Sequence, residues 1–194
     1  MNLRLLCGDA AAVLATLPPE SIQCCVTSPP YFGLRCYGVD GEIGKEPTPE
    51  EYVVRIVMVF REVRRVLKCD GVLWLNLGDS FAQAGGRGRQ GATSQRKGRA
   101  NVGAQEKKGS QRPHPGLKPK DLIGIPWMVA FALRADGWYL RADVIWSKPN
   151  AMPPSVTDRP NSAHEYLFLL SKSQRYFYDH EAVKEPAVPS ARGS

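Results

Sequence analysis

The residues with the clearest chemical potential form a short turn, Thr-Ser-Pro-Pro-Tyr, at positions 27–31. Each proline restricts the residue before it to extended conformations, so the turn is stiff. The Ser28 hydroxyl and the Pro29 carbonyl both accept hydrogen bonds, and the Tyr31 ring offers a flat face beside them. This combination suits an exocyclic amine on a planar base, because two acceptors that hold its hydrogens make the nitrogen lone pair available for attack on an activated methyl group. The alternative interpretation is a structural turn plugged by an aromatic ring.

The elements before the turn must place it at the end of a strand. Residues 3–6 predict a short strand, Asp9 predicts the cap of a helix over 10–17, and the apolar run 22–26 predicts a buried strand that leads directly into the turn. The Ser28 hydroxyl is therefore expected at the carboxyl end of a buried strand.

A second helix and strand follow. Thr48 predicts an N-cap, and apolar residues recur at helical spacing from residue 53 to 67. Gly71 is expected to end this helix, and the continuous apolar run 72–77 is typical of a strand buried on both faces.

The last third of the chain predicts one more helix and three strands. Asp121 is expected to cap the helix and Gly137 to close it. The expected ranges are 121–135 for the helix, 138–146 for a strand, and 166–170 with 176–178 for a hairpin. Together these elements predict an α/β fold with a partial doubly wound, mostly parallel sheet and an antiparallel edge hairpin, in which ligands bind beyond the carboxyl ends of the strands.

The positive charge is concentrated in one segment. The chain of 194 residues carries a formal net charge of +7, yet residues 85–120 alone hold ten Lys or Arg and one acidic residue, so the rest of the chain sums to −2. Almost no large apolar residue accompanies this charge, which favours a flexible basic insertion at about 82–117 within a single domain spanning 1–194. Such a segment binds polyanions by releasing counterions, which makes double-stranded DNA its expected partner. The phosphate contacts are expected from Arg87, Arg89, Arg96, Lys97 and Arg99.

Composition excludes several other classes. No apolar run approaches the ~20 residues that cross a bilayer, and the N-terminus has too short an apolar stretch for a signal peptide, so a cytoplasmic protein is expected. The five cysteines form no Cys-x-x-Cys pair, which favours free thiols over disulfides or a metal site.

The turn and its surroundings resemble the amino-group DNA methyltransferases, which methylate cytosine N4 or adenine N6 with S-adenosylmethionine. Residues 27–31 match the catalytic motif of this family, and further segments match it in the same order. These are Cys-Gly-Asp at 7–9, Leu-Gly-Asp-Ser at 77–80, Lys-Pro-Lys-Asp-Leu at 118–122, Trp-Ser-Lys-Pro-Asn-Ala-Met-Pro at 146–153, Asp-Arg-Pro at 158–160 and His-Glu-Tyr at 164–166. The resemblance implies a Rossmann-like methyltransferase fold, S-adenosylmethionine as cofactor and a flipped target base.

The resemblance also implies roles for individual residues. It assigns catalysis to Ser28, Pro29, Pro30 and Tyr31, with the Tyr31 ring stacked on the flipped base. Asp9 and Thr27 are implied near the cofactor, with helix capping as the alternative for Asp9. The loop residues Lys148, Asn150 and Arg159 are implied beside the target base or the DNA backbone.

The first residue of the motif bears on the base. Serine is commonest in enzymes that methylate cytosine N4, whereas aspartate or asparagine is commonest in those that methylate adenine N6, so Ser28 favours cytosine and leaves adenine as the alternative. Methylation at carbon 5 of cytosine needs a cysteine thiolate after a proline, and no cysteine here follows a proline.

One signature of the family is absent from the sequence. Members carry an Asp-Pro-Phe stretch and a Phe-x-Gly-x-Gly turn that wraps the cofactor, and neither occurs here. The cofactor-binding half is therefore expected to be missing, and methyl transfer by this chain alone to be weak or undetectable. A separate cofactor-binding half or a homodimer mate would compensate for the loss. The remaining alternatives are an inactive remnant that acts as a DNA-binding module and, less favoured, methylation of a protein glutamine.

Overall fold

The computed structural model describes residues 3–35, 37–82, 116–151 and 156–185, which form three helices and four strands. In chain order the elements are α1 (Ala10–Ala15), β1 (Ile22–Thr27), α2 (Pro49–Val66), β2 (Leu67–Leu77), α3 (Ile125–Ala135), β3 (Tyr139–Ser147) and β4 (His164–Ser171). Most of the expected basic insertion, 83–115, lies outside the described residues.

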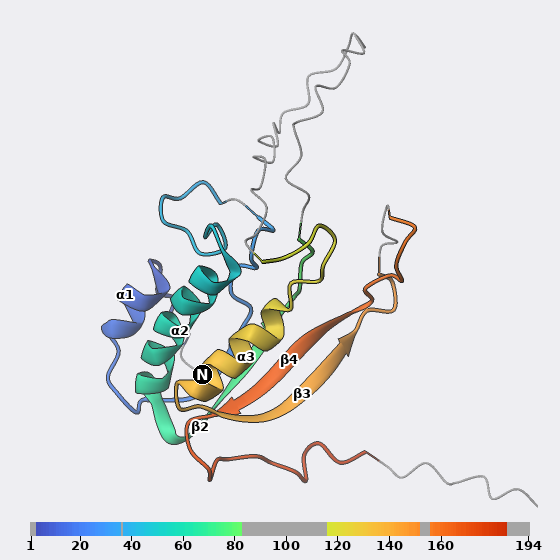
Figure 1. The fold of residues 1–194 in the computed structure, drawn as a ribbon. Helices are drawn as coiled ribbons and strands as arrows, with labels where there is room; N and C mark the ends of the chain where they lie inside the picture. Colours follow the sequence, from blue (N-terminus) through green and yellow to red (C-terminus); the bar gives the residue numbers. More distant parts are fainter. Residues whose placement is uncertain (1–2, 36, 83–115, 152–155, 186–194) are drawn as a thin grey trace, which may run out of the picture.

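The four strands form one mixed sheet in the order β1-β2-β4-β3. β1 and β2 are parallel, whereas β4 is antiparallel to both β2 and β3. The predicted α/β class is confirmed, but within the described residues the sheet is mixed rather than mostly parallel. Figure 1 shows α1, α2 and α3 side by side along the sheet, with β3 and β4 as a long curved hairpin.

The core lies between one face of the sheet and the helices α2 and α3. Leu73 pairs with Leu170 and Leu75 with Phe168, and all four side chains are fully buried on that face. α2 contributes its apolar stripe to the same cluster through Tyr52, Ile56, Phe60 and Val63. As predicted, the Thr48 hydroxyl caps α2 by accepting from the backbone N–H of Glu51 at 3.2 Å.

Two predicted strands do not form. Residues 3–6 are irregular, with Leu3 and Leu5 largely exposed, because no neighbouring strand in the described structure pairs with them. Residues 176–178 are also irregular. β4 pairs with β3 on one side and with β2 on the other, so neither side of β4 is open to a further strand. Gly71 lies inside β2 rather than at the end of α2, since the chain turns from helix to strand at Leu67.

The N-terminus of α3 is capped by a side chain from a distant loop. The Asp79 carboxylate accepts from the backbone N–H groups of Gly124 and Ile125 at 3.0 to 3.1 Å, which satisfies two of the helix's free donors. The expected cap, Asp121, instead accepts from the backbone N–H of Lys118 and lies before the helix. The cap ties the loop after β2 to the start of α3.

Replacing Asp79 by alanine is therefore expected to destabilise the protein by about 1 to 2 kcal/mol, because two N–H groups lose a charged acceptor. Chemical denaturation of both proteins measures this difference. Asp40→Ala removes an exposed carboxylate from a loop and should change the free energy of unfolding by less than about 0.5 kcal/mol. Equal effects of the two substitutions would show that the cap contributes nothing.

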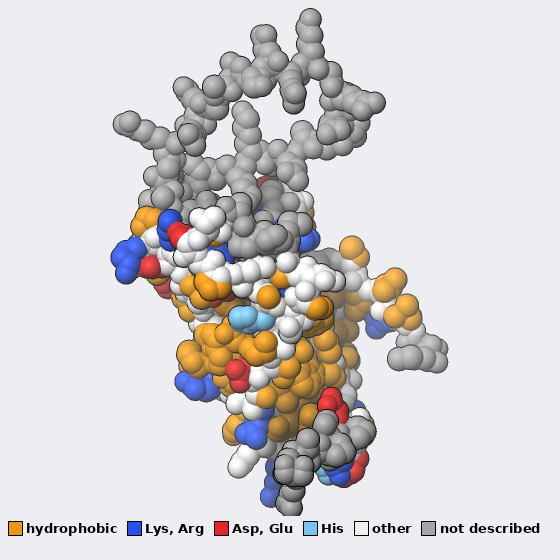
Figure 2. Space-filling view, turned by 90° about the vertical axis from the view of Figure 1, so that its right-hand side faces the viewer, with side chains coloured by type: hydrophobic (Ala, Val, Ile, Leu, Met, Phe, Trp, Pro, Cys, Tyr) orange, Lys and Arg blue, Asp and Glu red, His pale blue; other side chains and the backbone are white. Residues whose placement is uncertain are grey.

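The outer strand β3 exposes apolar side chains. Val144, Ile145 and Trp146 lie on its exposed part, and Trp146 is 55% exposed. In the view onto the side of the molecule where β3 lies, hydrophobic side chains gather across the middle (Figure 2). Among the helices of the described ranges, none is both long and apolar enough to cross a membrane.

Candidate active site

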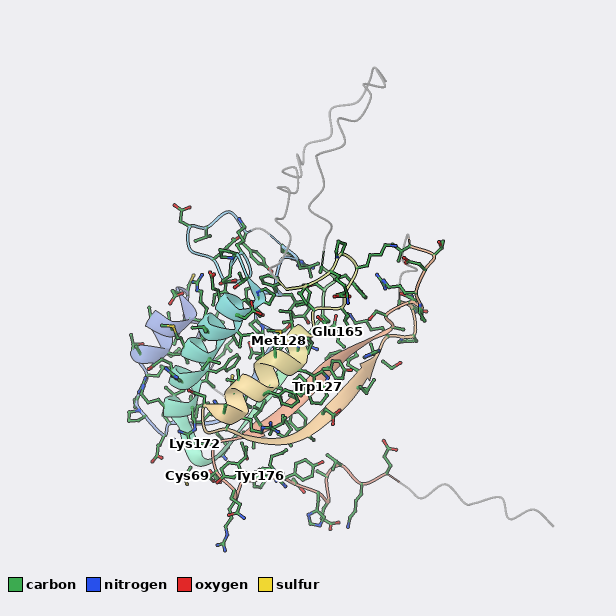
Figure 3. The ribbon with its side chains drawn as sticks, viewed as in Figure 1. Cys69, Trp127, Met128, Glu165, Lys172 and Tyr176 are labelled. Carbon is green, nitrogen blue, oxygen red and sulfur yellow. The ribbon has the colours of Figure 1, made fainter. Side chains whose placement is uncertain are left out.

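The carboxyl ends of β1, β2 and β3 and the start of β4 meet at one edge of the sheet. The turn 28–31 follows β1 there, and Glu165 lies at the start of β4 beside the first turn of α3, which carries Trp127 and Met128 (Figure 3). Cys69 and Lys172 lie at the opposite end of the sheet (Figure 3). The predicted position of the turn, beyond the carboxyl end of this strand, is therefore confirmed. The strand itself is not buried as expected, because β1 forms one edge of the described sheet, where none of its residues is buried and Val26 is 74% exposed.

Hydrogen bonds from two other segments anchor the backbone of the turn. The Tyr52 hydroxyl on α2 donates to the Pro30 carbonyl at 2.9 Å, and the Gly33 N–H donates to the Gly44 carbonyl at 2.8 Å. Gly44 has φ of +100°, and a Cβ there would lie 2.9 Å from the Tyr31 carbonyl oxygen. Only glycine fits this close approach at this backbone conformation. The loop that contains Gly44 therefore packs directly against the backbone of the turn.

The Tyr31 hydroxyl is the centre of a polar cluster at this edge. It accepts from the Ser28 hydroxyl at 3.1 Å, and it faces the Asn76 Oδ1 at 2.8 Å and the Glu165 Oε2 at 3.1 Å. Burial raises the pKa of the Tyr31 phenol, the Glu165 charge raises it further, and the hydrogen bond from Ser28 lowers it. Tyr31 is therefore neutral near pH 7 and donates one hydrogen to the cluster.

Glu165 has a cationic partner just after the end of β3. Lys148 forms a salt bridge with the Glu165 carboxylate. Although burial alone would raise the pKa of Glu165, hydrogen bonds from Lys148, Tyr31 and Asn76 outweigh it, so the pKa lies below the usual range of a glutamate. The carboxylate is therefore ionised at neutral pH.

The Tyr31 ring lies against the backbone of Gly78, just after β2. A Cβ built on Gly78 would come within 2.6 Å of the Tyr31 Cε2 and 2.9 Å of its Cδ2. Gly78 does not have the positive φ that favours glycine, so the small size of the residue rather than its flexibility is what the contact requires.

The two residues expected near the cofactor have structural partners. Asp9 caps α1, since its carboxylate oxygen Oδ1 accepts from the Ala12 N–H at 3.0 Å, as the capping interpretation predicted. Thr27 is the last residue of β1, pairs with Leu75 and is half-buried. Contact of either residue with a cofactor stays a prediction.

Three of the residues expected to contact DNA lie in the described part of the chain. Lys148 is paired with Glu165 inside the polar cluster, whereas Asn150 is exposed. The Arg159 guanidinium lies 3.9 Å from the centroid of the Phe81 ring, and its neighbour Asp158 pairs with Lys120. These two contacts hold Asp158 and Arg159 against Lys120 and Phe81, two described residues on either side of 83–115. The residues Arg87, Arg89, Arg96, Lys97 and Arg99 lie outside the described part of the chain.

Asn76 and Glu165 were not singled out as site residues by the sequence. Asn76 is the one polar residue of the apolar run 72–77, a signal that could have marked it. Glu165 opens a predicted strand, and only its pairing with Tyr31 in space shows where its carboxylate points.

The fold formed by these elements is that of DNA methyltransferases. The structure matches the PvuII DNA methyltransferase (cytosine-N4-specific) with a TM-score of 0.58 and 19% identity, covering 89% of this chain and 50% of that one. It also matches a putative DNA modification methylase from Thermus thermophilus, solved in complex with S-adenosyl-L-methionine, with a TM-score of 0.54 and 22% identity over 90% of this chain and 55% of that one.

The sequence identifies the family. Residues 22–192 match the family model N6_N4_Mtase, described as DNA methylase, and the chain belongs to this family. It is 52% identical over 188 residues to the Type II methyltransferase M.SmaI of Serratia marcescens, across 96% of this chain and 61% of that protein. It is 42% identical over 186 residues to the Type II methyltransferase M.SfiI of Streptomyces fimbriatus, across 95% of this chain and 39% of that protein. The chain thus spans about three fifths or less of the relatives it matches.

Proposed function

We propose that this chain carries the catalytic turn of a DNA methyltransferase that transfers a methyl group from S-adenosylmethionine to the exocyclic amine of a flipped base, with cytosine N4 favoured. The observation that carries the proposal is the exposed Ser28 at the carboxyl end of β1, whose hydroxyl hydrogen points to Tyr31. The Ser28 oxygen then keeps its lone pairs for the hydrogens of an incoming amine.

The residues of the turn would act by holding the amine. Ser28 and the Pro29 carbonyl would each accept one hydrogen of the amine, which favours a pyramidal nitrogen with an available lone pair. The Tyr31 ring would support the plane of the extruded base. Once the nitrogen carries the methyl group, its surplus proton leaves to water, so the site needs no dedicated base.

The cofactor proposed for this site supplies an electrophilic methyl group when bound. Two acceptors at the turn would suit a cationic sulfonium: the exposed Ser28 oxygen, and the half-buried Glu165 carboxylate, which stays ionised in its pair with Lys148. Asp9 and Thr27 remain the residues proposed to hold the cofactor, and the second carboxylate oxygen of Asp9 is not used in the helix cap.

The choice of base is tested by the product. The full chain, alone and mixed with a separately produced cofactor-binding half, is incubated with labelled S-adenosylmethionine and duplex DNA of mixed sequence, and the DNA is digested to nucleosides. The proposal predicts N4-methylcytosine. N6-methyladenine would establish the alternative base, and 5-methylcytosine would contradict the proposed chemistry.

The competing proposal is a DNA-binding module without methyl transfer. The ten cationic residues between 85 and 120 favour it. Such phosphate contacts predict that DNA affinity falls steeply with salt, by roughly 10³-fold or more between 50 and 200 mM if six or more of the cations contact phosphates.

Equilibrium binding of duplex DNA at several salt concentrations measures the slope, with a variant lacking residues 85–116 as comparison. The deletion should flatten the slope and weaken binding at low salt. An affinity that does not depend on salt, or that survives the deletion, would refute the role of the basic segment.

A further inference from the structure

The hydrogen bonds of the polar cluster run in one direction. Ser28 donates to the Tyr31 hydroxyl, and Tyr31 faces two acceptors, the Asn76 Oδ1 and the Glu165 Oε2. A phenol has one hydrogen, so Tyr31 directs it toward these two oxygens and not toward Ser28. Ser28 must then use its own hydrogen to reach Tyr31.

Both acceptors are fixed by partners of their own. The Asn76 Nδ2 donates to the Tyr166 carbonyl at 3.1 Å, which leaves the amide oxygen facing Tyr31. Glu165 is held by its salt bridge with Lys148, whose side chain is 43% exposed against 21% for the carboxylate. A carboxylate kept ionised by a lysine accepts hydrogen bonds but donates none.

We propose that Glu165, held by Lys148, is a positioning residue for the proposed methyl transfer, because its carboxylate sets the direction of the hydrogen-bond chain that makes Ser28 an acceptor. Without the negative charge of Glu165, only neutral acceptors such as the Asn76 Oδ1 hold the phenol hydrogen, which then turns toward Ser28 more readily. The Ser28 hydrogen would then face the incoming amine and repel it. The role given to Ser28 in this inference rests on the proposed function, whereas the contact between Tyr31 and Glu165 does not depend on it.

Lys148 gains a different role from the one implied by resemblance. Its ammonium group contacts the Glu165 carboxylate, so the positive charge of Lys148 is already paired within the protein. The lysine therefore acts on the turn through Glu165, and its contact with DNA stays a prediction.

The contact is tested by the ionisation of Tyr31 in the full chain. Ultraviolet absorbance of the tyrosines is followed as pH rises, and the component lost in Tyr31→Phe belongs to Tyr31. In Glu165→Gln, which keeps the size of the side chain, the Tyr31 midpoint should move to lower pH because the neighbouring negative charge is gone. Glu62→Gln removes a carboxylate of similar exposure that pairs with Arg65 on α2, and it should leave the midpoint unchanged.

The role in the reaction is tested by rates. Glu165→Gln should slow methyl transfer by about 10- to 100-fold with little change in the KM for S-adenosylmethionine, while Glu62→Gln stays close to the parent chain. Circular dichroism establishes that both variants fold. An unchanged Tyr31 midpoint, or an unchanged rate in Glu165→Gln, would overturn the inference. A shifted Tyr31 midpoint supports the inference even if the parent chain transfers no methyl group. The absence of methyl transfer in the parent chain would count against the proposed function alone.

Discussion

Replacing Ser28 by alanine is expected to lower the rate of methyl transfer by about 10²- to 10³-fold, the range seen when one preorganised hydrogen-bonding group is removed from a reaction centre. The variant loses the acceptor that would hold one hydrogen of the target amine. Because Ser28 is exposed and contributes only a hydrogen bond to Tyr31, the free energy of unfolding should change by less than about 0.5 kcal/mol. Single-turnover transfer from labelled S-adenosylmethionine, with a separate cofactor-binding half added to parent and variant alike, measures the rate, and chemical denaturation of the chain measures the stability.

Ser21→Ala provides the matched control. Ser21 is also exposed and its hydroxyl donates to the Pro18 carbonyl at 2.7 Å, but it precedes β1 and so lies at the other end of that strand. The control should transfer methyl groups at the parent rate. If Ser28→Ala and Ser21→Ala are equally active, the turn is structural and the proposed chemistry is wrong.

Replacing Gly78 by alanine is expected to slow methyl transfer by about 10²-fold, although Gly78 itself lies outside the turn. The added Cβ would lie 2.6 Å from the Tyr31 ring, so the ring must shift away from the place where its hydroxyl meets Ser28 and Glu165. Displacements of about 1 Å near a reaction centre are enough for such a loss. The same clash should destabilise the chain by about 1 to 3 kcal/mol, which denaturation detects.

A double-mutant cycle separates the clash from other effects of the substitution. In a chain that already carries Tyr31→Ala, the ring is gone and Gly78→Ala should cost much less stability than in the parent chain. An equal cost in both backgrounds would show that the contact between Gly78 and Tyr31 is not what constrains the site.

Local patterns predicted the elements that place the turn. β1 ends at Thr27, directly after the run 22–26, and α2 begins at Pro49 behind its Thr48 cap, because both signals depend on neighbours in the sequence. Gly137 closes α3 with φ of +100° for the same reason. The family resemblance was equally local, since it depended on short motifs that stand in the chain itself.

Long-range pairing was beyond the sequence. Residues 176–178 have the composition of a strand, yet the place beside β4 is taken by β3, which precedes it by a loop of sixteen residues, from 148 to 163. Composition indicates strand propensity but not which neighbour a strand finds.

The polar cluster shows the same limit. Tyr31 and Glu165 are 134 positions apart in the sequence. Lys148, which was expected to contact DNA, forms a salt bridge with Glu165 because the pairing of β3 with β4 brings the two residues together. Asp79, rather than Asp121, caps α3 because the loop after β2 brings its carboxylate to the helix start. Each case depends on an approach in space that no spacing in the sequence encodes.

The most direct test of the proposed catalytic turn is a crystal structure of the full chain with an S-adenosylmethionine analogue and a short duplex that contains a mismatched cytosine, since a mismatched base is extruded at lower cost. The proposed function predicts an extruded cytosine with its exocyclic nitrogen within hydrogen-bond distance of the Ser28 Oγ and the Pro29 carbonyl oxygen, while Tyr31 still contacts Glu165. A cytosine that stays stacked in the duplex, or that is extruded to a place away from Ser28, would contradict it.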